Sequence, residues 1–365
     1  MAMFPKKFLT TIAISSVLAL SSCMGHFYFC ILSFILATKL YFEIVNIRKK
    51  QDQEIKVGPS IFIFELMIYL TACYIFIPWL VFPRFLIETS LSNKDHWVYD
   101  AFYNYNPLFA FFMSVACFLF FVLHLKKGSY RYQVRIFVLS LVGAVFGFAG
   151  SLLACKNAYK GLFWVILPHS AMMINDSAAY LVGLTTFGKT RLVKISNHRT
   201  LEGFLIGMIS SSLWCYFAMQ VMAKNQALIC PQNNLELIPF KELSCEPPKA
   251  FSDRVFQLPY GLGSIYTSPA ALSCFFIAFC SSVIAPFSGY VMISVKRAYR
   301  IENQDENTIG FVDKLDSHGM ISYFMNFYLE SVLFKNRTRF QQLLELVSRL
   351  NQSEQQKLVN DILVN

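Results

Sequence analysis

Long apolar runs, separated by short polar segments, dominate the chain. A helix that crosses the hydrocarbon core of a bilayer needs roughly 20 apolar residues, and about 17 at the low end. Eight runs reach this length, and a ninth, shorter run covers Met320–Phe334. The pattern predicts an all-α polytopic membrane protein, a bundle of about eight to nine transmembrane helices. The eight runs are Phe8–Met24, Tyr28–Val45, Ile61–Val81, Leu108–Leu125, Ile136–Ala154, Gly161–Leu184, Phe204–Met222 and Ala270–Ile293.

The two ends of the chain are less regular. Residues 335–365 are polar, with leucines at helical spacing, which indicates an amphipathic helix on the membrane surface or against a partner, or a solvated tail helix. At the other end, Lys6 and Lys7 precede an apolar run that closes on Leu-Ser-Ser-Cys. This beginning suits a first span and equally a cleaved secretory or lipoprotein signal, so both interpretations stay open.

Positive charge follows the apolar runs. The chain holds 32 Lys+Arg against 22 Asp+Glu, a formal net charge of +10. The basic residues concentrate in every second connection, which predicts that these connections lie in the cytoplasm. Clusters at the ends of apolar runs suit anionic lipid or phosphate and disfavour nucleic acid as a partner. The basic connections are 46–60, 126–135, 185–203 and 294–319.

Composition excludes a soluble domain and the common cysteine sites. Only 15% of the residues are charged and 55% are hydrophobic, whereas a soluble domain carries about 25% charged residues. Most of the 10 cysteines lie in apolar runs, where they act as small hydrophobic side chains. No Cys-x-x-Cys pair occurs, which argues against a zinc or thioredoxin-type site.

A carboxylate lies inside one predicted span. Asn175 and Asp176 interrupt the apolar run Gly161–Leu184. An ionised Asp near the centre of a spanning helix costs about 2.5–3.5 kcal/mol on insertion scales, so it faces the bundle interior, a cavity or a cation. Tyr180 lies four residues further on and shares the helix face of Asp176. We favour a functional carboxylate over a structural one that pairs with Lys or Arg.

Two polar clusters follow predicted spans. The first reads F-G-K-T-R-L-V-K-I-S-N-H-R-T-L-E-G-F at 187–204, and its cations, hydroxyl groups and glycines suit a phosphate-bearing ligand. In the second, at 294–316, Lys296 and Arg297 precede Asp313 and Asp316, which lie three apart and could share a divalent cation. Taken alone, each cluster is more simply an ordinary charged segment beside the membrane.

Together and in this order, the three clusters resemble the eukaryotic CDP-diacylglycerol synthases, also called phosphatidate cytidylyltransferases. The span G-L-F-W-V-I-L-P-H-S-A-M-M-I-N-D-S-A-A-Y-L-V-G is similar to that family's G-L-x-W-x-x-x-P-x-x-x-x-x-x-N-D-x-x-A-Y-x-x-G. The segment 187–204 resembles its F-G-[RK]-T-x-L-x-x-[IL]-S-P-K-K-T-x-E-G-F, and P-F-S-G-Y-V-M-I-S-V-K-R-A-Y-R-I resembles its G-P-F-G-G-F-x-A-S-x-x-K-R-A-x-x-I. Cys230-Pro and Cys245-Glu-Pro match its loop between spans.

The chain departs from the family in the signature K-D-x-x-x-x-I-P-G-H-G-G-x-x-D-R-x-D. Here the stretch reads E-N-Q-D-E-N-T-I-G-F-V-D-K-L-D, in which Asp313, Lys314 and Asp316 match D-R-x-D. Pro-Gly-His-Gly is missing, and the Lys-Asp pair is either absent or displaced to near Asp305. The departure motivates a second hypothesis, a relative that binds phosphatidic acid or regulates a partner without catalysis. A transporter is disfavoured because no matching pair of broken helices is evident.

The resemblance implies an enzyme that joins CTP and phosphatidic acid into CDP-diacylglycerol and pyrophosphate for phospholipid synthesis. By motif, Asp313 and Asp316 would hold Mg²⁺ together with Asp176, and Lys296 and Arg297 would act with them in catalysis. The residues implied in substrate binding are Asn175, Tyr180, Lys194, Ser196, Arg199, Thr200, Glu202 and Lys314.

The resemblance also implies a setting. Residues 61–334 would form the transmembrane catalytic domain, after N-terminal spans and a basic linker at 1–60 and before the tail at 335–365. We expect an integral protein of the endoplasmic reticulum whose active site faces the cytoplasm. Its partners would be CTP, phosphatidic acid and the lipid bilayer. Both a monomer and a homodimer are compatible with the sequence. Cys230 and Cys245 would form a disulfide in the lumen, an oxidising compartment.

Overall fold

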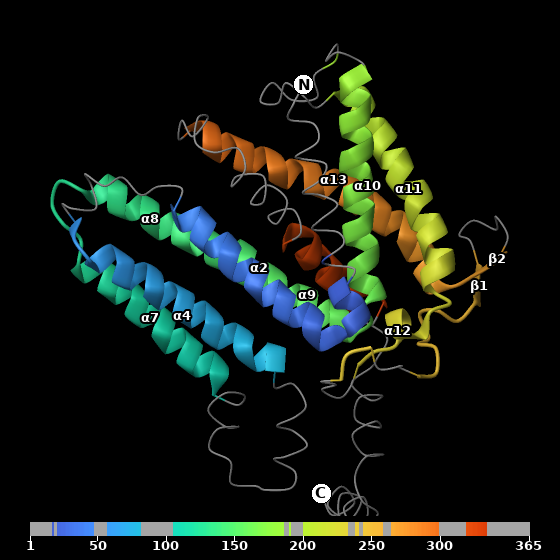
Figure 1. Ribbon diagram of the computed structural model, residues 1–365, viewed down its shortest axis with the longest axis horizontal. Coiled ribbons are helices and arrows are strands. Elements are labelled where there is room, and N and C mark those ends of the chain that lie inside the picture. The colour runs from blue at the N-terminus through green and yellow to red at the C-terminus, as the bar shows by residue number, and fades with distance from the viewer. Residues whose placement is uncertain are drawn as a thin grey trace, which may run out of the picture. The chain divides into compact units, whose positions relative to one another are not determined.

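The computed structural model describes residue 17 and residues 20–46, 57–81, 105–185, 190, 200–232, 238–240, 244–257, 264–298 and 319–333. Two compact units are distinguished, Met1–Met325 and Asn326–Asn365, and each is treated by itself. Most of the described chain is helical (Figure 1). The predicted helical class is therefore observed, while the amphipathic tail at 335–365 and most of the first predicted span lie outside the described residues.

The seven predicted runs from Tyr28 to Ile293 all coincide with helices. The run Ile136–Ala154 lies in a longer continuous helix in which a π-helical segment joins two α-helices. The ninth run is helical over 319–328 and then π-helical in η4 (Leu329–Leu333). The other elements are α2 (His26–Asn46), α4 (Ser60–Val81), α7 (Asn106–Leu123), α8 (Tyr130–Gly143), η2 (Ala144–Ala149), α9 (Gly150–Tyr159), α10 (Phe163–Thr185), α11 (Leu201–Met222), α12 (Gln226–Ile229) and α13 (Pro269–Ala298).

Within the described residues, four helices are long and apolar enough to cross a bilayer. They are His26–Asn46, Asn106–Leu123, Tyr130–Tyr159 and Leu201–Met222, and Ser60–Phe76 and Pro269–Ile284 are shorter apolar helices. Large side chains such as Phe111, Phe112 and Phe118 of α7 are more than half exposed. Such a surface requires lipid rather than water. The chain is thus an integral membrane protein, while the expected eight to nine spans stay a prediction.

The first group of helices packs around aromatic rings. α2 contacts α4, α8, η2 and α9, and α4 pairs with α7. Phe148 of η2 packs against Phe34 and Tyr41 of α2 and Phe76 of α4, with ring centroids 6.0, 6.2 and 6.3 Å away. Large apolar rings exclude water between these helices and bury a large area per residue.

Glycine lets a later segment approach this group closely. A methyl group added at Gly150 of α9 would lie 2.7 Å from the Cα atom of Gly319, so neither residue leaves room for a side chain. Asn157 of α9 donates a side-chain hydrogen bond to the main-chain oxygen of Ser322 at 3.2 Å. These contacts attach residues 319–325 to α9.

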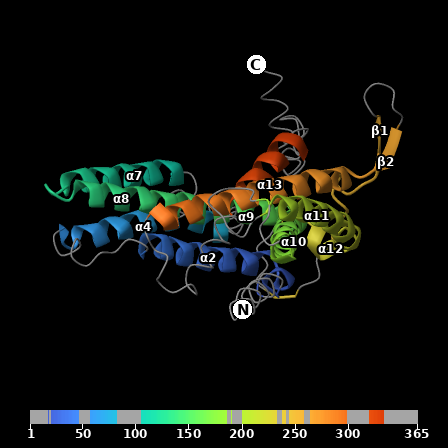
Figure 2. The same cartoon turned by 90° about the horizontal axis from the view of Figure 1, so that it is seen from above.

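The second group consists of α10, α11 and α13, which contact one another, and α10 also contacts α9. α10 and α11 lie side by side in both views (Figures 1 and 2). Hydrogen bonds connect α13 to the other two helices: the Ser211 and Ser282 hydroxyl groups lie 2.5 Å apart, and Ser281 donates to the carbonyl oxygen of Pro168 at 3.3 Å. This three-helix group carries the described candidate site residues.

The connection between α11 and α13 contains structure that the all-α expectation lacked. Strands β1 (Arg254–Gln257) and β2 (Ser264–Thr267) form an antiparallel ribbon in which Val255 faces Tyr266 and Phe256 faces Ile265. β-Branched and aromatic residues favour strands, but four residues per strand give too short a pattern to distinguish from a loop.

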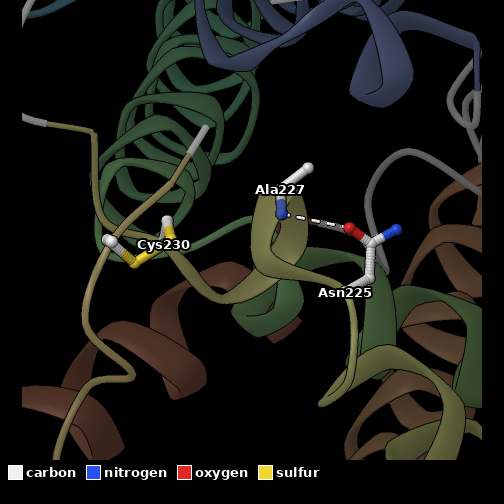
Figure 3. Close-up of a disulfide and its surroundings, with 4 residues drawn as sticks. Asn225, Ala227 and Cys230 are labelled. Atoms are coloured by element: carbon white, nitrogen blue, oxygen red, sulfur yellow. Dashed lines mark hydrogen bonds between the residues drawn. A yellow bond between two sulfur atoms is a disulfide. The ribbon is translucent and has the colours of Figure 1, made fainter. Parts of the chain in front are cut away.

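The same connection is crosslinked. Cys230 and Cys245 form a disulfide with their Cα atoms 5.9 Å apart. Figure 3 shows the bridge beside the short helix α12, which begins where the Asn225 side chain accepts a hydrogen bond from the main-chain nitrogen of Ala227 at 3.0 Å. The pairing implied by the family resemblance is thus present in the structure.

Candidate functional site

α10 carries the Asn-Asp pair and is anchored by its N-terminal turns. Trp164 is 1% exposed, and its ring centroid lies 5.6 Å from that of Phe251 in the connection before β1. Further along the helix, Asn175 is buried, Asp176 is half-buried and Tyr180 is 40% exposed. The three predicted residues therefore extend from the interior of the helix group towards its surface.

The first turns of α11 pack directly against this part of α10. Gly203 and Gly207 lie four residues apart on α11, and both are buried. A methyl group at Gly203 would lie 2.8 Å from the main-chain oxygen of Ala179, and one at Gly207 would lie 3.0 Å from that of Asn175. The structure thus packs the first two turns of α11 against the part of α10 that carries Asn175 and Ala179. Whether this region binds phosphate stays a prediction.

The N-terminus of α11 is fixed by two threonines and a carboxylate. The Thr200 hydroxyl caps the helix by accepting a hydrogen bond from the main-chain nitrogen of Gly203 at 3.1 Å. The main-chain nitrogen of Leu201 donates to the carbonyl oxygen of Thr190 at 3.0 Å. The Glu202 carboxylate also takes a hydrogen bond from the Thr190 side chain. A carboxylate in the first turn complements the positive end of the helix dipole.

Thr200 and Glu202, predicted to shape a nucleotide loop, both form hydrogen bonds within the protein itself: Thr200 with the backbone of α11 and Glu202 with the Thr190 side chain. Their predicted contribution to nucleotide binding stays a prediction. The same geometry shows what a phosphate would meet at this end of α11: a capped helix whose first carboxylate is held by a neighbouring hydroxyl group.

The third cluster is described only at its beginning. α13 runs to Ala298, so Lys296 and Arg297 form part of its last turn. Six predicted site residues lie outside the described part of the chain: Lys194, Ser196, Arg199, Asp313, Lys314 and Asp316. The predicted meeting of Asp176 with Asp313 and Asp316 thus remains a prediction.

Among the described residues, no group of three or more His, Cys, Asp or Glu side chains lies together as a ready metal site. Asp176 is the one predicted metal ligand that those residues include. Its carboxylate is a hard oxygen donor, the type that Mg²⁺ prefers.

Two residues of this region were not identified from the sequence as interacting. Thr190 was one hydroxyl in a basic segment, and only the fold places it against Glu202. Gly207 had no assigned role, yet it lies against Asn175. The spacing Gly203-x-x-x-Gly207 inside an apolar run is the signal that could have indicated a close helix contact.

A comparison with protein families matches residues 5–332 to the cytidylyltransferase family. That span includes all three helix-associated clusters and both cysteines of the disulfide. The match covers most of the chain, so the family assignment does not rest on one short motif.

Individual relatives agree. The chain is 25% identical to phosphatidate cytidylyltransferase 3 of Arabidopsis thaliana over 348 residues, covering 92% of this chain and 72% of the relative. It is 26% identical to a putative phosphatidate cytidylyltransferase of Schizosaccharomyces pombe, covering 93% and 78%. Human phosphatidate cytidylyltransferase 1 is 30% identical over 239 residues, which is 63% of this chain and 51% of the relative. The chain therefore belongs to the cytidylyltransferase family and is a membrane-bound nucleotidyltransferase of the CDP-diacylglycerol synthase type.

Proposed function

We propose that this protein is a phosphatidate cytidylyltransferase, which converts CTP and phosphatidic acid into CDP-diacylglycerol and pyrophosphate. The observation that carries the proposal is the similarity, over more than nine-tenths of this chain, to plant and fungal relatives that bear this name. The half-buried Asp176 in an apolar helix supports it. An ionised carboxylate inside a membrane-spanning helix costs free energy, so such a residue usually has a function.

In this reaction an oxygen atom of the lipid phosphate attacks the α-phosphorus of CTP. The new P–O bond forms as the bond from the α-phosphorus to the bridging oxygen of the β-phosphate breaks, and pyrophosphate leaves with that oxygen. Both reactants are anions, so the protein's task is to neutralise charge and to align the two phosphates. We assign this task to Lys194, Lys296 and Arg297, with Arg199 and Lys314 assisting.

The carboxylates of Asp176, Asp313 and Asp316 are the residues proposed to hold Mg²⁺. Bound there, the cation would supply positive charge for the phosphates of CTP. Asn175, Tyr180, Ser196, Thr200 and Glu202 are proposed to contact the substrates or to shape their binding loop. The Thr190–Glu202 contact supports this, because a side chain that is already held in place loses less entropy when a nucleotide binds.

We place the protein in the endoplasmic reticulum, with these residues at the cytoplasmic face. The alternation of basic and sparsely charged connections supports that orientation. The disulfide lies in a connection assigned to the opposite side, where an oxidising lumen would maintain it.

A second candidate function is favoured by one observation. The stretch 302–316 lacks the Pro-Gly-His-Gly segment and the Lys-Asp pair of the family signature. A relative with that change could bind phosphatidic acid or regulate a partner without transferring the nucleotide.

One assay separates the two functions. Purified protein in lipid nanodiscs receives CTP, Mg²⁺ and phosphatidic acid, and the CDP-lipid formed is measured beside an Asp316→Ala variant. The transferase predicts CDP-lipid formation at least 100-fold above the variant, as expected for losing a residue that stabilises the transition state. Wild-type protein that forms no more product than the variant would contradict the transferase and favour the non-catalytic relative.

A further inference from the structure

The contact between α10 and α11 depends on two glycines. Gly203 and Gly207 lie on one face of α11, and Asn175 and Ala179 lie four residues apart on the facing part of α10. A methyl group at Gly203 would approach the main-chain oxygen of Ala179 to 2.8 Å, well inside ordinary van der Waals contact, which begins at 3.4 Å. A methyl group at Gly207 would overlap the Oδ1 atom of Asn175 and lie 3.0 Å from its main-chain oxygen.

Main-chain oxygen atoms of α10 therefore lie next to the positions where side chains of α11 would begin. At these positions a glycine has only a Cα–H group, which can make weak hydrogen bonds to a carbonyl oxygen. Small residues at four-residue spacing allow this close approach between helices in membranes. Glycine at both positions is thus a requirement of the observed distance between the helices.

Asn175 is the residue most dependent on this contact. Its side chain is 1% exposed, and within the described part of the chain its Oδ1 atom has no hydrogen-bond donor. Gly207 is the neighbour against which that oxygen lies. A larger residue at Gly207 would therefore displace Asn175 and, through the helix backbone, the adjacent Asp176.

The same contact also fixes the start of α11. A methyl group at Gly203 would lie 3.0 Å from the Thr200 hydroxyl that caps the helix, and Thr200 is followed at once by Leu201 and Glu202, which bind Thr190. The distance between the Asn-Asp pair and the Thr190–Glu202 segment is therefore set where the glycines contact α10.

We propose that Gly207, assisted by Gly203, is a positioning residue that holds Asn175 and Asp176 at a fixed distance from the N-terminus of α11. The proposal rests on the proposed transferase function for its catalytic consequence. Separating the helices by on the order of 1 Å would misalign the reacting phosphates, and a misplacement of this size can lower turnover roughly 100-fold.

The test is a double-mutant cycle of Gly207→Ala, Asn175→Ala and the combined variant, in nanodiscs. Gly143→Ala is the matched control, because a methyl group there meets only side-chain atoms, the nearest in the Tyr41 ring at 3.2 Å, in the other helix group. We expect Gly207→Ala to lower kcat roughly 100-fold and KM for CTP less than about threefold. We expect Gly143→Ala to stay within about threefold of wild type in both.

Coupling is the decisive readout. If Gly207 acts through Asn175, Gly207→Ala should lower kcat by less than about tenfold once Asn175 is alanine. The melting temperature is measured for the same variants, because a double-mutant cycle in stability can be read even from an inactive protein. Asn175→Ala removes the Oδ1 atom, so in the combined variant it should restore at least half of the stability that Gly207→Ala loses. The combined variant also serves if Gly207→Ala alone does not fold.

The outcomes are distinguishable. Wild-type protein that forms no CDP-lipid contradicts the proposed function, and the melting-temperature cycle then tests the glycine contact alone. An active wild type with Gly207→Ala indistinguishable from Gly143→Ala overturns the positioning role. Additive effects of Gly207→Ala and Asn175→Ala on both turnover and melting temperature overturn it as well.

Discussion

Replacing Cys230 and Cys245 by serine is expected to loosen the connection after α11 without unfolding the helices. The bridge closes a loop with a sequence separation of 15. Cys230 is fully buried and lies at the end of α12, where its main-chain nitrogen donates to the carbonyl oxygen of Gln226 at 2.9 Å. Two residues further on, the main-chain nitrogen of Gln232 donates to the carbonyl oxygen of Tyr159 at 3.0 Å. The bridge thus restrains a segment that is also bound to α9.

The loop length sets the magnitude. The chain-entropy model assigns about 3 kcal/mol to a crosslink that closes a loop of about 15 residues. Each 1.4 kcal/mol changes an equilibrium constant roughly tenfold, so the open population of this segment should rise roughly 100-fold. The spans are held by packing elsewhere, so the opening is local rather than global.

Hydrogen exchange followed by mass spectrometry measures this opening directly. Peptides that contain the Cys230 and Gln232 amides should exchange roughly 100-fold faster in the Cys230→Ser/Cys245→Ser variant. Reduction of the wild-type protein should reproduce the effect, whereas Cys23→Ser, at an exposed free cysteine, should not. Unchanged exchange in the double-serine variant, or two free thiols in the wild-type protein, would refute the reasoning.

Three further predictions concern two helix contacts and the charge of Asp176. Thr200→Ala removes the cap that binds the Gly203 nitrogen and should cost about 1 kcal/mol of stability in a denaturant titration, whereas Thr200→Ser should cost much less; equal losses would argue against capping. Asn157→Ala leaves the Ser322 carbonyl without its side-chain donor and should lower stability by about 1–3 kcal/mol. The loss should appear as faster hydrogen exchange over 319–325, and unchanged exchange there would contradict it. Asp176→Asn keeps the side-chain size but removes the charge, and CDP-lipid formation should fall at least roughly 100-fold while the melting temperature holds or rises; near-normal turnover would exclude Asp176 from the site.

The helices could be predicted because bilayer thickness imposes one long apolar run per span. The boundaries were less certain, and the helix Tyr130–Tyr159 extends beyond the predicted Ile136–Ala154 at both ends. Its extra turns include Arg131 and Lys156, whose long side chains can reach the interface while the helix continues. The β1–β2 ribbon was missed, because strands of four residues give no periodicity that distinguishes them from a loop.

The candidate site could likewise be predicted only in part from the sequence. Asp176 could be identified because an ionisable side chain inside an apolar run is rare and energetically costly. Asn175 was predicted to contact substrate, and the structure places it against Gly207, a neighbour that no local pattern assigns. Thr190 binds Glu202 across 12 residues of sequence, and only the fold brings the two together. Contacts between distant segments are what single-sequence reasoning lacks.

The most direct test of the account follows the phosphorus atoms of CTP. Purified wild-type protein is incubated with Mg²⁺, phosphatidic acid and CTP that carries radioactive phosphorus at either the α or the γ position. Attack on the α-phosphorus predicts that the α label enters the lipid fraction and the γ label leaves in pyrophosphate. Label that stays in CTP at both positions, or a γ label that enters the lipid, would contradict cytidylyl transfer by this chain.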